Sequence, residues 1–144
     1  AFNEVSVMRQ THQAAKISIK INGIQRMKEL ICDGVLVSTA AGSTAYNFSA
    51  HGNILPLESK LLALTPISSF RPRRWRGALL NEDTKIIMNI NDANLRTSSV
   101  TADNKEFRNI KKVEIISDRK YACNLLFNNH HSIEEKILKE QFSQ

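Results

Sequence analysis

The chain has 144 residues, the size of one domain, with 42% hydrophobic and 24% charged residues, as in an ordinary soluble globular protein. No apolar run approaches the ~20 residues that a membrane-spanning helix needs, and the N-terminus lacks the pattern of a secretory signal. The formal net charge of +6 favours an anionic partner, which could be a nucleic acid, a phosphorylated metabolite or an acidic lipid.

Most of the chain carries the pattern of β-strands. Residues 5–8 and 16–23 alternate apolar and polar side chains, as half-buried strands do. Residues 29–39 form a nearly continuous β-rich run, which predicts a buried strand bent at Gly34. Further strand-like runs, separated by turn residues, follow at residues 84–92, 98–107, 111–118 and 121–127.

Short helices interrupt this pattern. A helix is expected over residues 44–51, with Gly52 placed to stop it, and a helical turn over residues 57–64. The clearer helix spans residues 133–142, where Ser132 and Glu135 form a capping box. Its apolar side chains share one face, which we expect to pack on the body of the domain or on a partner subunit. The fold class is therefore mainly β, in a single domain over residues 1–144.

The cysteines, Cys32 and Cys123, both lie in apolar, strand-like runs. Free, buried thiols in a reducing compartment explain them better than a disulfide or a metal pair. No other cysteine or histidine stands at metal-ligand spacing, and the adjacent His130 and His131 fall in a polar turn. We therefore predict a cytoplasmic protein with no metal site in this chain.

A hydroxyl-rich loop follows the run at residues 29–39. Gly42 can adopt unusual backbone angles and lets a ligand approach the main chain. Ser38, Thr39, Ser43 and Thr44 offer hydroxyl groups, and a helix beginning near Thr44 would point free N–H groups at the loop. Tyr46 offers a ring for stacking on a base. These are parts of a nucleotide pocket, and they are equally typical of a capped strand-to-helix turn. The loop is neither a Walker loop nor a GxGxxG fingerprint.

The residues of this loop also resemble a family signature. DGVLVSTAAGSTAYNFSAHG, at residues 33–52, strongly resembles the long signature of bacterial NAD kinases, which include inorganic polyphosphate/ATP-NAD kinases. FNEVSV (2–7), LTPISSFRPRRWRG (64–77) and TADNKEF (101–107) resemble shorter family motifs in the same order. The departures are Ala40-Ala41 for the usual Pro-Thr, His51 and Asn53 for Gly and Pro, and Asn104 for a turn Gly.

The resemblance implies the β-sandwich-like C-terminal domain of the NAD kinase fold, which holds NAD and builds a homo-oligomer, a dimer or a tetramer. The family's Gly-Gly-Asp-Gly motif, with the proposed catalytic base, belongs to an N-terminal α/β domain and is absent from these residues. We therefore expect a C-terminal portion that is inactive alone. The full protein would phosphorylate the 2′-hydroxyl of the adenosine ribose of NAD to give NADP. The donor would be ATP or polyphosphate, with Mg²⁺ or another divalent ion bridging the donor phosphates.

The same resemblance implies roles for residues at both ends of the predicted β-rich run. Asn3 can present its amide to a base edge, and Glu4 can accept hydrogen bonds from paired ribose hydroxyls, as acidic residues do in dinucleotide sites. Asp33 would contact the nicotinamide end of NAD, in a neighbouring subunit by family analogy. Each of these residues also has a plain structural interpretation, as a solvated strand start or a strand-end cap.

The adenine pocket would be formed after the loop. Thr44, Ala45 and Tyr46 would line it, with Ala45 leaving room for the base. Ser49 lies one helical turn beyond Ala45 and can reach the same face.

A second basic feature stands at residues 71–77, where the sequence RPRRWRG places four arginines around Trp75. Such clusters bind single-stranded nucleic acid, and they also suit dinucleotide phosphates or a subunit contact. The arginines can stack on Trp75 and pair with Glu82 or Asp83. The alternative function is thus a basic, β-rich nucleic-acid-binding module without kinase activity, which the family signature makes the second choice. No membrane partner is expected.

Overall fold

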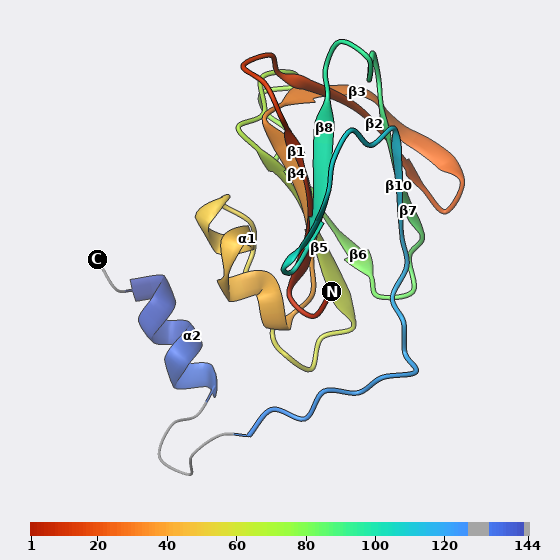
Figure 1. Ribbon diagram of the computed structural model, residues 1–144. Helices are drawn as coiled ribbons and strands as arrows, with labels where there is room; N and C mark the ends of the chain where they lie inside the picture. Colours follow the sequence, from red (N-terminus) through yellow and green to blue (C-terminus); the bar gives the residue numbers. More distant parts are fainter. Residues whose placement is uncertain (127–132, 143–144) are drawn as a thin grey trace.

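The computed structural model describes residues 1–126 and 133–142 and shows two antiparallel β-sheets packed face to face (Figure 1). The strand order is β6-β5-β4-β1-β8-β9 in the six-stranded sheet and β10-β7-β2-β3 in the four-stranded sheet. The prediction of a mainly β, sandwich-like domain with short helices is confirmed.

The element bounds are as follows. The six-stranded sheet contains β1 (Glu4–Arg9), β4 (Gly34–Ser38), β5 (Leu61–Ile67), β6 (Ala78–Asn81), β8 (Ser98–Ala102) and β9 (Lys105–Phe107). The four-stranded sheet contains β2 (Ala15–Ile21), β3 (Ile24–Cys32), β7 (Ile86–Ile90) and β10 (Lys112–Ile115). The helical elements are the 3₁₀ turn η1 (Ala41–Thr44), α1 (Tyr46–Ser49) and α2 (Ile133–Phe142).

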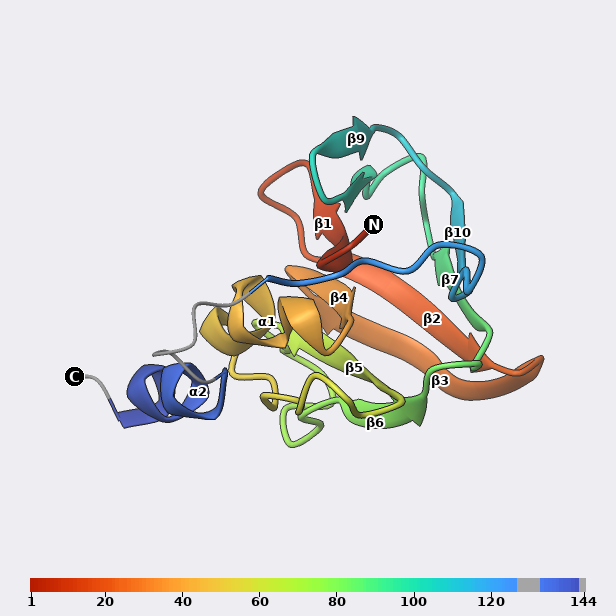
Figure 2. The ribbon, with the colours of Figure 1, turned by 90° about the horizontal axis from the view of Figure 1, so that it is seen from below.

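The core lies between the two sheets. Val7 and Val35 enter it from the six-stranded sheet, and Ile17, Ile86 and Met88 enter it from the four-stranded sheet, all fully buried. β7 shows the alternating burial expected of a strand with one face in the core. β4 is buried at every position, because its outer face lies under η1 and α1, as Figure 2 shows.

The predicted bent strand over residues 29–39 is wrong, because the run is divided between β3 of one sheet and β4 of the other. Asp33 is the residue between them. A Cβ atom at Gly34 would lie 2.4 Å from the carbonyl oxygen of Val7, so only a glycine lets β4 begin this close to β1. The Asp33 amide donates to the carbonyl oxygen of Ile67 at 3.0 Å, which ties the corner to β5.

Other strand and helix predictions also need correction. Residues 57–64 are not helical, because a turn precedes β5, whose buried leucines pair with β4 and β6. Here tertiary pairing overrides the helix propensity of a Leu- and Ala-rich segment. β6 and the first half of β3, which is largely exposed, were not predicted. Residues 121–126 form no strand, and residue 127 lies outside the described residues.

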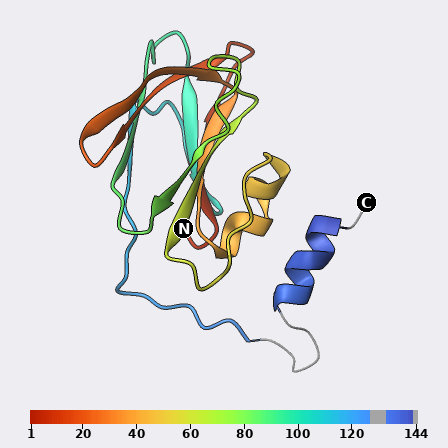
Figure 3. The ribbon, with the colours of Figure 1, turned by 180° about the vertical axis from the view of Figure 1, so that it is seen from behind.

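The predicted helix at residues 133–142 is confirmed as α2, whereas its capping residue Ser132 lies outside the described residues. Figures 1 and 3 place α2 on the same side of the molecule as α1. The side chains of Leu138 and Phe142 remain 52% and 79% exposed. Among the described residues, no helix is long and apolar enough to cross a membrane.

The two thiols differ, contrary to the prediction that both are buried. Cys32 is buried in β3, whereas Cys123 is exposed. Burial and the neighbouring charge of Asp33 raise the pKa of the Cys32 thiol to about 12, although the Gly34 amide opposes the shift.

We therefore predict that only Cys123 reacts with an aromatic disulfide reagent in the native protein, since the thiolate is the nucleophile. Absorbance at pH 8 should report one thiol per chain, and two after unfolding in guanidinium chloride. A Cys123→Ser variant is the control and should show no native reaction. Equal rates for both thiols in the folded chain would contradict the assignment.

Candidate nucleotide-binding site

The hydroxyl-rich loop is fastened to the N-terminal segment by its own side chains. The Thr39 amide donates to the carbonyl oxygen of Asn3 at 2.9 Å. The Thr39 hydroxyl donates to the carbonyl oxygen of Phe2 at 2.8 Å and accepts from the Gly42 amide at 3.1 Å. A Cβ atom at Gly42 would lie 2.2 Å from the Asn3 carbonyl oxygen. Gly42 is therefore needed for close packing and not for unusual backbone angles, because its φ is not positive. The approach of a ligand to the main chain at Gly42 stays a prediction.

A second set of bonds closes the loop from inside. The fully buried Ser43 donates its hydroxyl to the carbonyl oxygen of Ala40 at 2.7 Å and accepts from the Leu55 amide at 2.9 Å. Ser38 is also fully buried, and its hydroxyl donates to the carbonyl oxygen of Thr39 at 2.9 Å. These hydroxyls hold the loop together and are engaged within the protein.

Asn47 connects the loop to β5 and was not singled out from the sequence. Its side chain is fully buried and donates to the carbonyl oxygens of Ser43 and Asn53 at 3.1 and 2.9 Å. Its amide oxygen accepts from the Thr65 hydroxyl at 2.7 Å. A Cβ atom at Gly52 would lie 2.1 Å from that oxygen, so Gly52 leaves the space that Asn47 fills. The periodicity of residues 44–51 carries no signal for this network.

The predicted helix at residues 44–51 is shorter than expected. α1 has four residues, and the amides of Phe48 and Ser49 both bond the carbonyl oxygen of Ala45, at 3.0 and 3.4 Å. The contribution expected from a helix dipole is therefore small. The chain leaves the helix through His51, whose φ of 62° is left-handed. The family that the sequence resembles usually has a glycine at this position. Gly52, which was expected to stop the helix, is not the left-handed residue.

The remaining polar side chains of the loop have no strong hydrogen-bond partner among the described residues. The hydroxyls of Thr44 and Ser49 make no hydrogen bond with the described residues. Ala45 is exposed and Tyr46 is 38% exposed. The Tyr46 hydroxyl lies 3.8 Å from the sulfur of Met8 in β1, a weak contact. The four residues predicted to line the adenine pocket are thus adjacent, and their side chains are available to a ligand.

Asp103 organises the start of β1 from the turn between β8 and β9. Its carboxylate accepts hydrogen bonds from the backbone amides of Phe2, Asn3 and Glu4, the last two at 2.9 and 3.3 Å. Desolvation opposes ionisation, but these amides and the terminal amino group outweigh it and hold the pKa of Asp103 below its usual range. The left-handed residue of this turn is Asp103, with a φ of 51°, and not Asn104.

Glu4 is the carboxylate that lacks a partner. Its Oε2 atom is buried and makes no hydrogen bond among the described residues. Burial, together with the charge of Asp103, raises the pKa of Glu4. Glu4 lines a cavity of about 790 Å³ together with Phe2, Thr39 and Tyr121. The side chain of the half-buried Asn3 also makes no hydrogen bond among the described residues.

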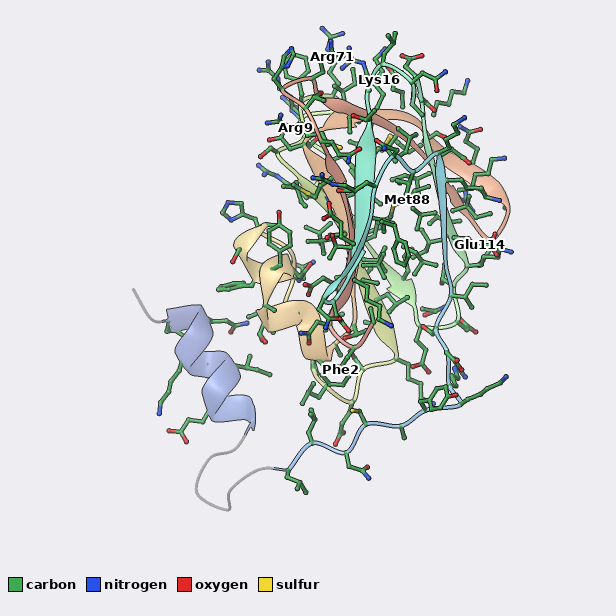
Figure 4. The ribbon with its side chains drawn as sticks, in the orientation of Figure 1. Phe2, Arg9, Lys16, Arg71, Met88 and Glu114 are labelled. Carbon is green, nitrogen blue, oxygen red and sulfur yellow. The ribbon has the colours of Figure 1, made fainter. Side chains whose placement is uncertain are left out.

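Asp33 lies apart from this group. Register pairs Glu4 with Ser38 at one end of β1 and Met8 with Gly34 at the other. Figure 4 shows the two ends, marked by Phe2 and Arg9. The Asp33 carboxylate forms an ion pair with the Arg9 guanidinium, with 2.5 Å between Oδ1 and Nε. The structure therefore brings the loop residues to Asn3 and leaves Asp33 at the far end, and a contact of Asp33 with nicotinamide stays a prediction.

Residues 68–76 form the arginine-rich loop. Its arginines make neither of the two predicted contacts, stacking on Trp75 and pairing with Glu82 or Asp83. The guanidinium groups of Arg71 and Arg73 lie over the ring of Phe70, at 5.5 and 5.1 Å from its centroid, and not over Trp75. Trp75 instead packs against the core. Glu82 pairs with Arg119 at 3.1 Å, and no arginine of this loop has an acidic partner among the described residues.

The described residues contain no large cluster of metal-ligating side chains. No group of three or more histidine, cysteine, aspartate or glutamate side chains among residues 1–126 and 133–142 could hold a metal ion. What they offer is a pinned loop with available hydroxyls, an exposed aromatic ring and an unpaired carboxylate. These features describe a candidate nucleotide-binding site on a mainly β domain.

Comparison with known proteins identifies the family. Residues 2–122 match the family described as the ATP-NAD kinase C-terminal domain. The chain is 56% identical over 142 residues to the NAD kinase of Rickettsia bellii, and 56% identical over 143 residues to that of Xylella fastidiosa. These alignments cover 99% of the chain and 56% or 55% of the relatives, so it spans little more than half their length. The chain belongs to the NAD kinase family and corresponds to its C-terminal domain.

Solved structures agree with this assignment. An NAD kinase from Archaeoglobus fulgidus in complex with ATP superposes with a TM-score of 0.73 and 26% sequence identity, covering 83% of this chain and 46% of that chain. Yeast NADH kinase complexed with NADH has a TM-score of 0.68 at 22% identity, covering 79% of this chain and 34% of that chain, and supports the fold alone. The alternative of a nucleic-acid-binding module gains no support.

The Asn47 network generates a stability prediction. Asn47→Ala removes the side-chain donor to the carbonyl oxygens of Ser43 and Asn53 and the acceptor of the Thr65 hydroxyl. It should lower the free energy of unfolding by about 2–3 kcal/mol. Urea titration followed by fluorescence measures this change. Asn89→Ala is the matched control, because Asn89 makes only one side-chain bond, at 3.4 Å to Ser18. Adding Thr65→Val to Asn47→Ala should cost less than the sum of the single variants. Strict additivity would contradict the network.

The raised pKa of Glu4 generates a pH prediction. Folding favours the protonated carboxyl, so wild type incurs a penalty that is absent below the unfolded pKa of about 4.5 and grows as pH rises through the folded pKa. Glu4→Gln should therefore gain stability relative to wild type between pH 4 and pH 7 in thermal melts. Asp103→Asn should show the opposite sign, losing stability relative to wild type as pH rises, because the pKa of Asp103 is lowered. A pH-independent difference for Glu4→Gln would refute this account.

Proposed function

We propose that this chain is the dinucleotide-binding part of an NAD kinase. The reaction transfers a phosphoryl group from ATP or polyphosphate to the 2′-hydroxyl of the adenosine ribose of NAD and gives NADP. The observation that carries the proposal is that the side chains of Thr44, Tyr46 and Ser49 are available to a ligand. They follow directly after the close packing of Gly42 against Asn3. The chain that contains them matches the family over residues 2–122.

Phosphoryl transfer depends mainly on positioning and charge stabilisation, and the chain's residues can do the positioning. Tyr46 stacks on the adenine, with Ala45 leaving space for it and Thr44 beside it. Asn3 reads the base edge with its amide. Glu4 accepts from the ribose hydroxyls through its unpaired Oε2 atom, which fixes the hydroxyl that faces the donor.

The proposal assigns the donor chemistry to groups outside the described residues. A divalent ion such as Mg²⁺ would supply charge neutralisation on the donor phosphates. The sequence also lacks the Gly-Gly-Asp-Gly loop of the family. The isolated chain therefore binds a dinucleotide weakly and does not convert NAD to NADP.

The proposal also includes a homo-oligomer, a dimer or a tetramer, in the cytoplasm. Its support is the exposed apolar surface of the C-terminal segment, where Tyr121 and Leu126 are 83% and 95% exposed in addition to the apolar residues of α2. In such an assembly Asp33 is the residue that would reach the nicotinamide end of NAD bound by a neighbouring subunit.

Replacement of Tyr46 tests the proposed function. Base stacking on an aromatic ring is worth about 1–3 kcal/mol, so Tyr46→Ala should weaken NADP binding about tenfold or more in calorimetry. Tyr46→Phe keeps the ring and should retain most of the affinity. Phe107→Ala, which removes an exposed aromatic ring from β9, is the control.

An oligonucleotide titration at two salt concentrations accompanies this measurement. Equal NADP affinity of wild type and Tyr46→Ala, or tight and steeply salt-dependent oligonucleotide binding without NADP binding, would refute the proposed function.

A further inference from the structure

We propose that the cavity between α1 and the arginine-rich loop is a phosphate subsite, in which Arg73 and Arg76 bind the phosphate groups of the dinucleotide whose adenosine stacks on Tyr46. The inference rests on the proposed function and extends it to residues that this function had left unassigned. It gives the arginines a defined ligand chemistry, a diphosphate attached to a nucleoside.

The cavity has a volume of about 310 Å³ and adjoins the adenine-binding residues directly. Tyr46 and Ser49 line it from α1, and Arg73 and Arg76 line it from the arginine-rich loop. Ser68 and Ser69 also line it, and no acidic residue is among the lining residues. A ligand that stacks on Tyr46 therefore has two guanidinium groups within the adjoining space.

The charge of these arginines is not neutralised inside the protein. Neither Arg73 nor Arg76 forms an ion pair with a described residue. Residues 59–81 include five lysines and arginines and no aspartate or glutamate. Guanidinium groups match phosphate geometry and bind it through paired, charge-assisted hydrogen bonds. The cavity is therefore suited to an anion, and phosphate is the anion that a dinucleotide carries.

The loop holds these arginines in place before any ligand arrives. The amides of Phe70 and Arg71 donate to the carbonyl oxygen of Ile31 at 2.8 and 3.1 Å, and the Ile31 amide donates to the Arg71 carbonyl oxygen at 2.9 Å. Between the two arginines, Trp75 packs against the core. The guanidinium of Arg73 is further placed by the ring of Phe70. Such pre-organisation reduces the ordering cost of binding.

The cavity also reaches towards the corner at Asp33. Ile67 lines it, and the Ile67 carbonyl oxygen accepts from the Asp33 amide at 3.0 Å. Phosphate groups attached to an adenosine on Tyr46 would therefore extend from α1 towards this corner.

The test compares ligands with and without phosphate groups, by calorimetry on the 144-residue chain at low salt. The double variant R73Q/R76Q should bind NAD and NADP at least tenfold more weakly than wild type and bind adenosine with unchanged affinity. The matched control is R71Q/R74Q, which removes an equal charge from the same loop at exposed positions that do not line the cavity. It should stay within twofold of wild type. R73K/R76K, which keeps charge but not the forked geometry, should show an intermediate loss, and thermal melts confirm folding.

Two results overturn the inference and leave the proposed function intact. One is unchanged NAD and NADP affinity in R73Q/R76Q while Tyr46→Ala loses it. The other is weakened binding of ATP and inorganic triphosphate alone, which would assign the cavity to the donor phosphates. A wild-type chain that binds neither NAD nor NADP would instead overturn the proposed function.

Discussion

The contact between Gly42 and the backbone of Asn3 is the constraint on which the site depends. A hydrogen atom in place of a side chain lets the loop after β4 lie against the start of β1, where even a methyl group would meet the Asn3 carbonyl oxygen at 2.2 Å. The contact fixes Asn3 and Glu4 on one side and η1 with α1 on the other. Segments about 40 positions apart in the sequence are thereby held against each other.

The polar groups around this contact fall into two sets with opposite physical roles. Ser38, Thr39 and Ser43 are engaged in bonds that hold the loop, whereas Thr44 and Ser49 are left unpaired. The carboxylates divide in the same way. Asp103 is stabilised in its charged form by backbone amides, and Glu4 is destabilised in that form by burial. Unpaired hydroxyls and a destabilised carboxylate are groups that gain when a ligand supplies partners.

The sequence was sufficient for the fold class, for most strands and for the position of the loop, because alternation and the family signature are local. It was not sufficient for the corner at Asp33, since strand-like residues continue on both sides of it. Only the pairing of β3 with β2 and of β4 with β1 shows the change of sheet. The leucines before Thr65 have a high helix propensity and were predicted to be helical. In the structure they form β5, because β4 and β6 pair with it. The role of Asn47 depends on Thr65 and Asn53, which no spacing rule joins to it. The unusual backbone angles expected at Gly42 are absent, because its packing against Asn3 depends on a contact between distant segments.

The saturated side chain of Asn47 has a consequence for recognition. With both amide protons and the amide oxygen engaged, the segment from η1 to His51 loses its conformational freedom when the chain folds and not when a nucleotide arrives. In the proposed complex, an ill-fitting base would therefore not be accommodated by movement of the backbone. Discrimination among purines would then depend on shape, at the small exposed methyl group of Ala45.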